Sequence, residues 1–224
     1  MLQMTLIGLD PAQQPLHPLM AETVRDVLLG GIGPPALRSE AVLVINGPDG
    51  PPRYCNGPVE LIILHSPGNY PWQYAYQLAH ELGHLSARSD LRFPRSDGLM
   101  WIEEVLADCH TLIALKRMAS GNGLLKSGAT SYLRHLLETQ GSQMPLPGWY
   151  RENEDALRSA MSLTVECRDV SKYIFMHVDH ERILSDNRQL VRLGAGETVE
   201  TFLDRWAAMG DDDKGVPTLL KRLL

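Results

Sequence analysis

Residues 77–86, which read Gln-Leu-Ala-His-Glu-Leu-Gly-His-Leu-Ser, carry the pattern on which the interpretation of this chain depends. Apolar positions recur here at helical spacing, so we expect the segment to form part of a helix. On a helix, His80 and His84 project from one face about one turn apart, close enough for both imidazoles to bind one zinc ion. Glu81 lies between them, where a carboxylate can take a proton from a metal-activated water and later deliver it to a leaving amine.

A catalytic zinc ion needs a third protein ligand, and the next predicted helix supplies acidic residues for it. The run Trp-Ile-Glu-Glu-Val-Leu-Ala-Asp occupies residues 101–108, after a polar loop that follows the histidines. Such a short loop allows the two helices to pack side by side. The candidates near the metal are therefore Glu103, Glu104 and Asp108.

These two segments together resemble the zincin metallopeptidases, and within them the gluzincins, whose third zinc ligand is a glutamate on the helix after the HExxH helix. Glu104 lies twenty residues after His84, and residues 104–108 are similar to the ExxxD motif of thermolysin-like enzymes. The order Trp-Ile-Glu-Glu also resembles the glutamate helix of gluzincin aminopeptidases, which again matches Glu104 to the ligand and leaves Glu103 as the alternative. The resemblance covers residues 70–119.

The resemblance implies a Zn2+ cofactor held by His80, His84 and Glu104, with Glu81 as the general base. It also implies that Asp108 orients His80 through a hydrogen bond, which fits the general need of a metal-bound imidazole for a carboxylate partner. A weaker similarity connects the chain to cytosolic gluzincin-like peptidases that cleave repressors.

The same resemblance predicts where a substrate binds. Zincins bind extended peptides along an exposed edge strand that precedes the HExxH helix, and we expect residues 59–65 to form that strand, with Leu61 and Ile63 as substrate contacts. Zincin catalysis also needs a donor, commonly a His or a Tyr, that stabilises the oxyanion. The candidates on a predicted helix of the C-terminal half are Tyr173, His177 and His180.

The predicted elements change along the chain from mixed α/β to helical. The predicted strands are 4–9, 41–46 and 59–65, and the predicted helices are 16–29, 70–88, 100–119, 122–139, 152–165, 171–184 and 198–209. With the resemblance, this pattern predicts an α+β, zincin-like fold with a small mixed sheet. We expect the 224 residues to form a single domain, with an α/β lobe over 1–88 that holds the HExxH helix and a mostly helical lobe over 89–224.

Composition and charge argue against several classes of partner. The net charge of −6 is mild and the Lys and Arg residues are scattered, so nucleic acid is not an expected partner. No stretch approaches the roughly 20 apolar residues that span a bilayer, and the opening lacks the basic region of a signal peptide, so we expect a cytoplasmic protein without membrane contact. Cys55, Cys109 and Cys167 are far apart and are expected to be reduced and mostly buried, and His110 is expected to be exposed.

These features together predict a zinc-dependent peptidase that hydrolyses a peptide or protein substrate. Two alternatives stay open at this point. One is a catalytically inactive zincin-fold module that binds peptides or regulates a partner. The other is an interaction protein whose C-terminal helices cover the cleft. The choice between endopeptidase and exopeptidase is likewise open.

Overall fold

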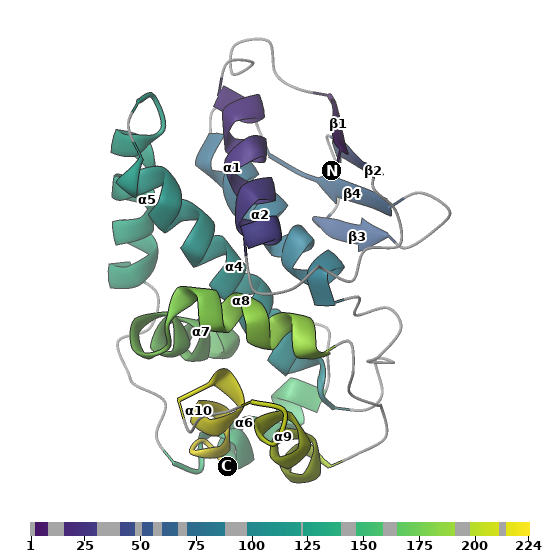
Figure 1. Ribbon diagram of the computed structural model, residues 1–224, viewed down its shortest axis with the longest axis vertical. Helices are drawn as coiled ribbons and strands as arrows, with labels where there is room; N and C mark the ends of the chain where they lie inside the picture. Colours follow the sequence, from purple (N-terminus) through teal and green to yellow (C-terminus); the bar gives the residue numbers. More distant parts are fainter. Residues whose placement is uncertain are drawn as a thin grey trace.

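The computed structural model describes residues 3–8, 16–30, 41–47, 51–55, 60–66, 71–87, 98–121, 123–139, 147–158, 165–190, 198–210 and 214–224. These residues form an α+β fold in which an N-terminal mixed sheet is followed by a mostly helical region (Figure 1). The predicted α+β class is confirmed, whereas the division into two lobes at residue 88 stays a prediction.

The sheet of the described residues has the strand order β1-β2-β4-β3. Its strands are β1 (Gln3–Ile7), β2 (Ala41–Asn46), β3 (Arg53–Cys55) and β4 (Glu60–Leu64). β1, β2 and β4 run parallel, and β3 pairs antiparallel with β4. Alternate residues of the two central strands, among them Val44 and Ile62, are buried, as expected for strands with one face against a core.

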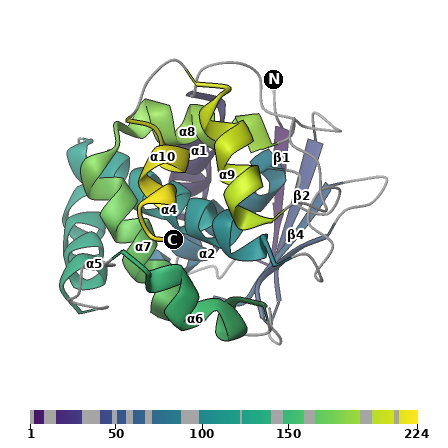
Figure 2. The same ribbon diagram turned by 90° about the horizontal axis from the view of Figure 1, so that it is seen from below.

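Helices α1 (Leu16–Gly30) and α2 (Pro71–Ala87) lie on one side of the sheet, which stands at the edge of the molecule (Figures 1 and 2). α1 packs against α2, and α2 contacts β4. The side-chain amide of Gln77 accepts a hydrogen bond from the His65 N–H at 2.9 Å and donates one to the His65 carbonyl at 2.7 Å. This pair of bonds fixes α2 against the end of β4.

Helix α4 (Met100–Ser120) is the centre of the helical region and packs against α1, α2, α5, α7 and α8. Its side chains are buried on nearly every side, which is the pattern of a core helix. The other helices of this region are α5 (Lys126–Thr139), α6 (Trp149–Arg158), α7 (Val165–His177), α8 (His180–Gln189), α9 (Val199–Ala207) and α10 (Val216–Lys221). Helices α6, α9 and α10 lie together at the end of the molecule that holds the C-terminus (Figure 1).

Two helices predicted in the C-terminal half have wrong boundaries. The helix predicted at 152–165 corresponds to α6, which begins earlier, at Trp149, and is described to Arg158; residues 159–164 lie outside the described residues, and Val165 begins α7. The helix predicted at 171–184 falls on two helices, α7 and α8. Asp179 divides them, because its backbone leaves the helical region (φ −58°, ψ 138°) and its carboxylate accepts hydrogen bonds from the first N–H groups of α8.

The strand predicted at 59–65 is present as β4, but its predicted place at an exposed edge is wrong. β4 is paired on both sides, and its Leu61 and Ile63 are register partners of Cys55 and Arg53 on β3. The edge on this side of the described sheet therefore belongs to β3. A strand of three residues next to prolines has no alternating pattern by which the sequence could predict it.

The burial of the three cysteines and of His110 can be compared with the expectations from the sequence. Cys109 and Cys167 are buried, Cys55 is half-buried, and the three thiols are outside any disulfide, as expected. The predicted exposure of His110 is wrong, since this residue is only 3% exposed and accepts a hydrogen bond from Asn187 Nδ2 on α8 at 3.0 Å. Burial lowers the pKa of His110 to about 3, so the imidazole is neutral.

Candidate metal centre

The site forms where α2 meets α4 at a very close approach. Gly83 on α2 faces Ala107 on α4, and a Cβ atom at position 83 would lie 2.7 Å from the Ala107 Cα. Any larger residue at position 83 would therefore push the two helices apart. This approach brings the acidic side chains of α4 within reach of the histidines of α2.

Three side chains offer metal-ligating atoms within 4.8 Å of one another: His80, His84 and Glu104. The two imidazole Nε2 atoms are 3.1 Å apart, and oxygens of Glu104 lie 3.2 Å from Nε2 of His80 and 3.4 Å from Nε2 of His84. Ligand atoms bound tetrahedrally to zinc at about 2.0–2.1 Å are about 3.3 Å from one another, so these separations suit a metal ion between them. The three ligands predicted from the sequence thus come together as a site that can hold a metal ion.

The other nitrogen of each imidazole faces a carboxylate of α4. Asp108 Oδ1 lies 3.0 Å from His80 Nδ1, and Glu103 Oε1 lies 2.7 Å from His84 Nδ1. Each carboxylate favours the tautomer with the proton on Nδ1, which leaves the Nε2 lone pair for a metal. Glu103, the alternative ligand, is therefore placed to support His84 rather than to bind the ion together with Glu104.

These contacts shift the pKa values of the cluster. Burial lowers the pKa of His80, but its contacts with Asp108 and Glu104 outweigh burial, and the net shift is well upward. Burial also opposes protonation of His84, yet Glu104 and Glu103 raise its pKa to about 9. Burial would raise the pKa of Glu104, but the two imidazoles lower it to about 2. In the metal-free protein the histidines thus hold protons that a bound metal ion would replace.

A cavity of about 220 Å³ opens at the cluster. Its described lining residues are Pro52, Tyr76, Gln77, His80, Glu81, Glu104, Asp108 and Arg168. Glu81, the predicted general base, is only 5% exposed and shares this lining with two of the ligands. A molecule that enters the cavity therefore meets the ligand cluster and the Glu81 carboxylate together.

The sequence analysis assigned no role at the metal site to Tyr76 or Arg168, which are both among the lining residues. The Tyr76 ring stacks on the His80 ring with centroids 6.3 Å apart, and its hydroxyl donates a hydrogen bond to Asp108 Oδ1 at 2.8 Å. Burial and the charge of Asp108 raise the pKa of Tyr76, so it stays a neutral donor. Its place one helical turn before His80 is a signal that could have found it. Arg168 lies on α7, and no spacing in the sequence connects it to the motif.

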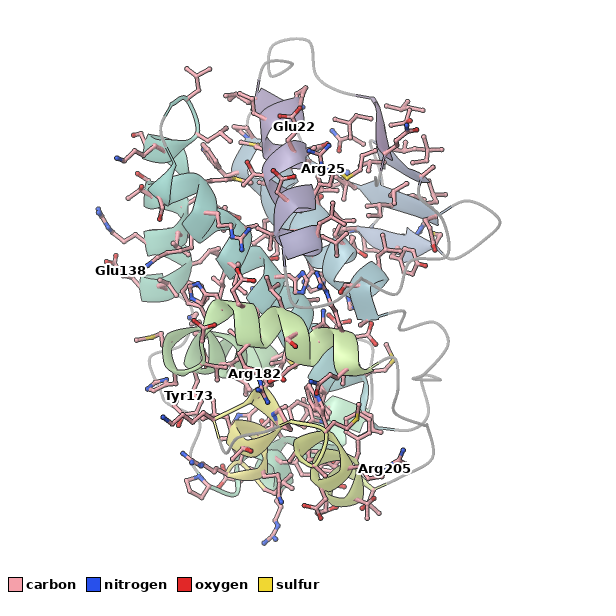
Figure 3. All side chains as sticks on the ribbon, in the orientation of Figure 1. Glu22, Arg25, Glu138, Tyr173, Arg182 and Arg205 are labelled. Atoms are coloured by element: carbon pink, nitrogen blue, oxygen red, sulfur yellow. The ribbon has the colours of Figure 1, made fainter. Side chains whose placement is uncertain are left out.

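The three predicted oxyanion donors are not in the lining of this cavity. Tyr173 lies on the flank of the helical region (Figure 3), and its ring contacts the ring of His177 with centroids 4.4 Å apart. The His180 ring stacks on Phe175 at 4.6 Å. The structure thus brings these rings together with neighbours on α7 and α8 and not with the metal ligands.

Comparisons of this chain with protein-family models, with curated proteins and with solved structures found no match. The interpretation of the site therefore depends on its own side chains. Among the described helices, none is both long and apolar enough to cross a membrane.

Proposed function

We propose that this protein is a zinc-dependent metallopeptidase of the gluzincin type with a zincin-like fold. The observation that carries the proposal is the cavity in which Glu81 borders the ligands His80 and Glu104. Two imidazoles and one carboxylate are a usual ligand set of catalytic zinc, and three protein ligands leave the open position that a structural site lacks. The proposal includes a cleft between the lobes formed by residues 1–88 and 89–224.

The roles of the surrounding side chains follow from their places. A zinc ion at the three ligands would supply Lewis-acid activation of water and would polarise the scissile carbonyl. Glu81 would accept the proton of the attacking water and pass it to the leaving amine. Asp108 and Glu103 would hold the two imidazoles in orientation through their hydrogen bonds to Nδ1.

The edge strand β3 supports a peptide as the substrate. Within the described sheet β3 has a partner on one side only, and it contacts α2. Pro52, directly before β3, lines the cavity. A peptide added along the free side of β3 would gain main-chain hydrogen bonds and extend toward the metal centre. The substrate-binding role predicted for Leu61 and Ile63 passes to β3 in this proposal.

Zinc content and peptide cleavage together test the proposal. We expect about one zinc ion per chain in the parent and markedly less in Glu104→Ala, which loses a ligand. Glu81→Gln should keep the zinc and lose about 100-fold or more of the cleavage of a peptide library, because the general base is gone. Glu138→Gln changes an exposed glutamate on α5 and is the matched control (Figure 3).

Three other results would contradict a part of this proposal. Cleavage by Glu81→Gln at the parent rate would contradict the mechanism. A zinc-loaded parent that cleaves no peptide would favour the catalytically inactive, peptide-binding module. A parent that holds no zinc, even after refolding with added zinc, would contradict the metal site itself.

A further inference from the structure

Arg168 is a cationic side chain that helix α7 contributes to the cavity of the metal centre. It is partly buried and shares the lining of that cavity with His80, Glu81 and Glu104. α7 packs along α4, so Arg168 belongs to a wall separate from the two helices that carry the ligands. Among the described lining residues, it is the one with a permanent positive charge.

The guanidinium of Arg168 makes no hydrogen bond and no ion pair with any residue that the structure describes. Asp108, an acid of the same lining, is engaged by His80 and Tyr76 instead. A guanidinium whose donors are not engaged can bind an anionic oxygen that enters the cavity.

The charges of the lining allow an anionic ligand once a metal is bound. Its described members include three carboxylates, those of Glu81, Glu104 and Asp108, and the single guanidinium of Arg168. The formal charge of these groups is thus −2, which a divalent metal ion would balance. An anion beside Arg168 would then meet no net repulsion from the cavity walls.

A second cation lies one turn further along α7. Lys172 borders a smaller cavity of about 10 Å³ together with Arg168, Tyr76 and Asp108. Its ammonium is 3.8 Å from the carboxylate of Asp169, an ion pair within α7. Of the two cations on this wall, Arg168 is therefore the one that presents its charge to the larger cavity.

We propose that Arg168 binds a carboxylate of the substrate and so selects anionic peptides for this cavity. The inference depends on the proposed peptidase function, since it assigns a substrate class to the same site. A planar guanidinium pairs with both oxygens of a carboxylate, and an amide in place of the carboxylate loses the charge that makes this pairing strong. The carboxylate belongs either to the C-terminus of a short peptide or to an Asp or Glu side chain near the scissile bond. Arg168 is a specificity residue and takes no part in the bond-breaking step.

Calorimetry on zinc-loaded Glu81→Gln protein tests this proposal, because that variant leaves peptides intact. One arm compares peptides with a free C-terminal carboxylate with their C-terminal amides. The other compares amidated peptides that contain Glu with the same peptides that contain Gln. In one of the two arms we expect the carboxylate member to bind on the order of 10- to 100-fold more tightly, the value of a charge-assisted hydrogen-bonded pair.

Variants of Arg168 in the same background assign the effect to this side chain. Arg168→Met should abolish the preference. Arg168→Lys should keep part of it, because lysine carries the positive charge but lacks the planar guanidinium that pairs with both carboxylate oxygens. Arg205→Met, at an exposed arginine of α9, is the matched control and should keep the full preference (Figure 3).

Equal affinity within both arms would overturn the inference, as would a preference that survives Arg168→Met. Where Arg168→Met does not fold, Arg168→Lys decides the point, because an undiminished preference in that variant would also overturn the inference. A parent protein that cleaves amidated and neutral peptides as fast as anionic ones would overturn the inference and leave the peptidase proposal intact. A parent with neither zinc nor cleavage would overturn both.

Discussion

The two imidazoles of the candidate metal centre each have a carboxylate partner, but the two pairs lie in different surroundings. Glu103 holds His84 at 2.7 Å and is only 1% exposed. Asp108 holds His80 at 3.0 Å, lines the cavity, and accepts a second hydrogen bond from Tyr76. Both carboxylates come from α4, so the contrast lies in what surrounds each pair and not in the helix that supplies it.

This difference suggests a division of roles between the two sides. A hydrogen bond to a charged group is stronger where water is excluded. The buried pair of Glu103 and His84, here called the His84 side, should therefore contribute more to holding a metal ion than the pair of Asp108 and His80, the His80 side. The His80 side borders the cavity, and the Asp108 carboxylate also accepts a hydrogen bond from Tyr76. A ligand in the cavity can therefore contact this pair. In the proposed peptidase, the His84 side would retain the ion and the His80 side would respond to the substrate.

The largest expected effect comes from Gly83→Ala, which disturbs both sides at once. The added methyl would meet the Ala107 Cα at 2.7 Å, so α2 and α4 must separate. We expect zinc affinity to fall by more than about 100-fold and the free energy of unfolding by about 2 kcal/mol. Competition with a chelator and chemical denaturation measure the two, with exposed Ser127→Ala on α5 as control. Unchanged zinc affinity would show that the helix approach does not set the site.

Glu103→Ala removes the carboxylate partner of His84 and leaves the pair of Asp108 and His80 intact. His84 Nδ1 loses its carboxylate in a place that water does not reach, and we expect zinc affinity to fall by about 100-fold. Glu103→Gln should recover part of the loss, since an amide oxygen still accepts from Nδ1. The same chelator competition applies, with Glu138→Ala as control. A loss below about threefold would contradict the role assigned to this side.

His110 can be compared with the two histidines of the site, because its partner is the amide of Asn187 in place of a carboxylate. Burial lowers its pKa to about 3 from the ordinary value of 6.5, so below pH 6.5 the unfolded chain binds a proton that the folded chain does not. Stability from this residue is therefore present above pH 6.5 and lost as the pH falls. Between pH 6.5 and 5 we expect a loss of about 2 kcal/mol in the metal-free protein.

Denaturation of metal-free protein at these two pH values measures this loss. His110→Gln should flatten the pH dependence relative to the parent, and the exposed His135→Gln should not. His84, with its pKa raised to about 9, stays protonated in the folded chain over this window and contributes alike to parent and variant. Identical slopes for parent and His110→Gln would contradict the assignment.

The part of the site that lies close together in sequence could be predicted from the sequence. The spacing of His80 and His84 is a local property of one helix, and the next helix could be expected to pack beside it. The structure brings Glu104 to both histidines and places Asp108 within hydrogen-bond distance of His80. The α+β class followed from the switch between β-branched runs and helical periodicity.

The rest depended on contacts between distant segments. The role of Glu103 follows from which face of α4 meets α2, and that is set by the Gly83 approach. Arg168 reaches the cavity only because α7 packs along α4. Tyr173 was favoured by residue type, and residue type does not reveal which flank of a helix faces a cavity. The burial of His110 likewise depends on α8, a helix far along the chain.

On the cavity side of the centre, Asp108→Ala should have a smaller effect than the change at Glu103. The His80–Asp108 contact is longer and more exposed, so we expect zinc affinity to fall by only about 10-fold. If the chain is the proposed peptidase, cleavage should fall further than zinc loading explains, since Asp108 lines the cavity. Zinc affinity and kcat at saturating zinc separate the two effects. A loss of zinc affinity equal to that of Glu103→Ala would remove the contrast between the two sides.

The smallest expected effect is that of Tyr76→Phe, which removes one donor from Asp108. The Tyr76 hydroxyl and His80 Nδ1 share the same carboxylate oxygen, so the tyrosine fixes the direction in which that oxygen points. Its loss should lower zinc affinity by about fivefold, the value of one ordinary hydrogen bond. Tyr132→Phe is the matched control, because its ring contacts Tyr76 edge-on and lies outside the cavity lining. If both variants changed zinc affinity equally, the effect would not be specific to the hydrogen bond from the Tyr76 hydroxyl to Asp108, and the His80–Asp108 contact would reduce to a simple pair like its buried counterpart.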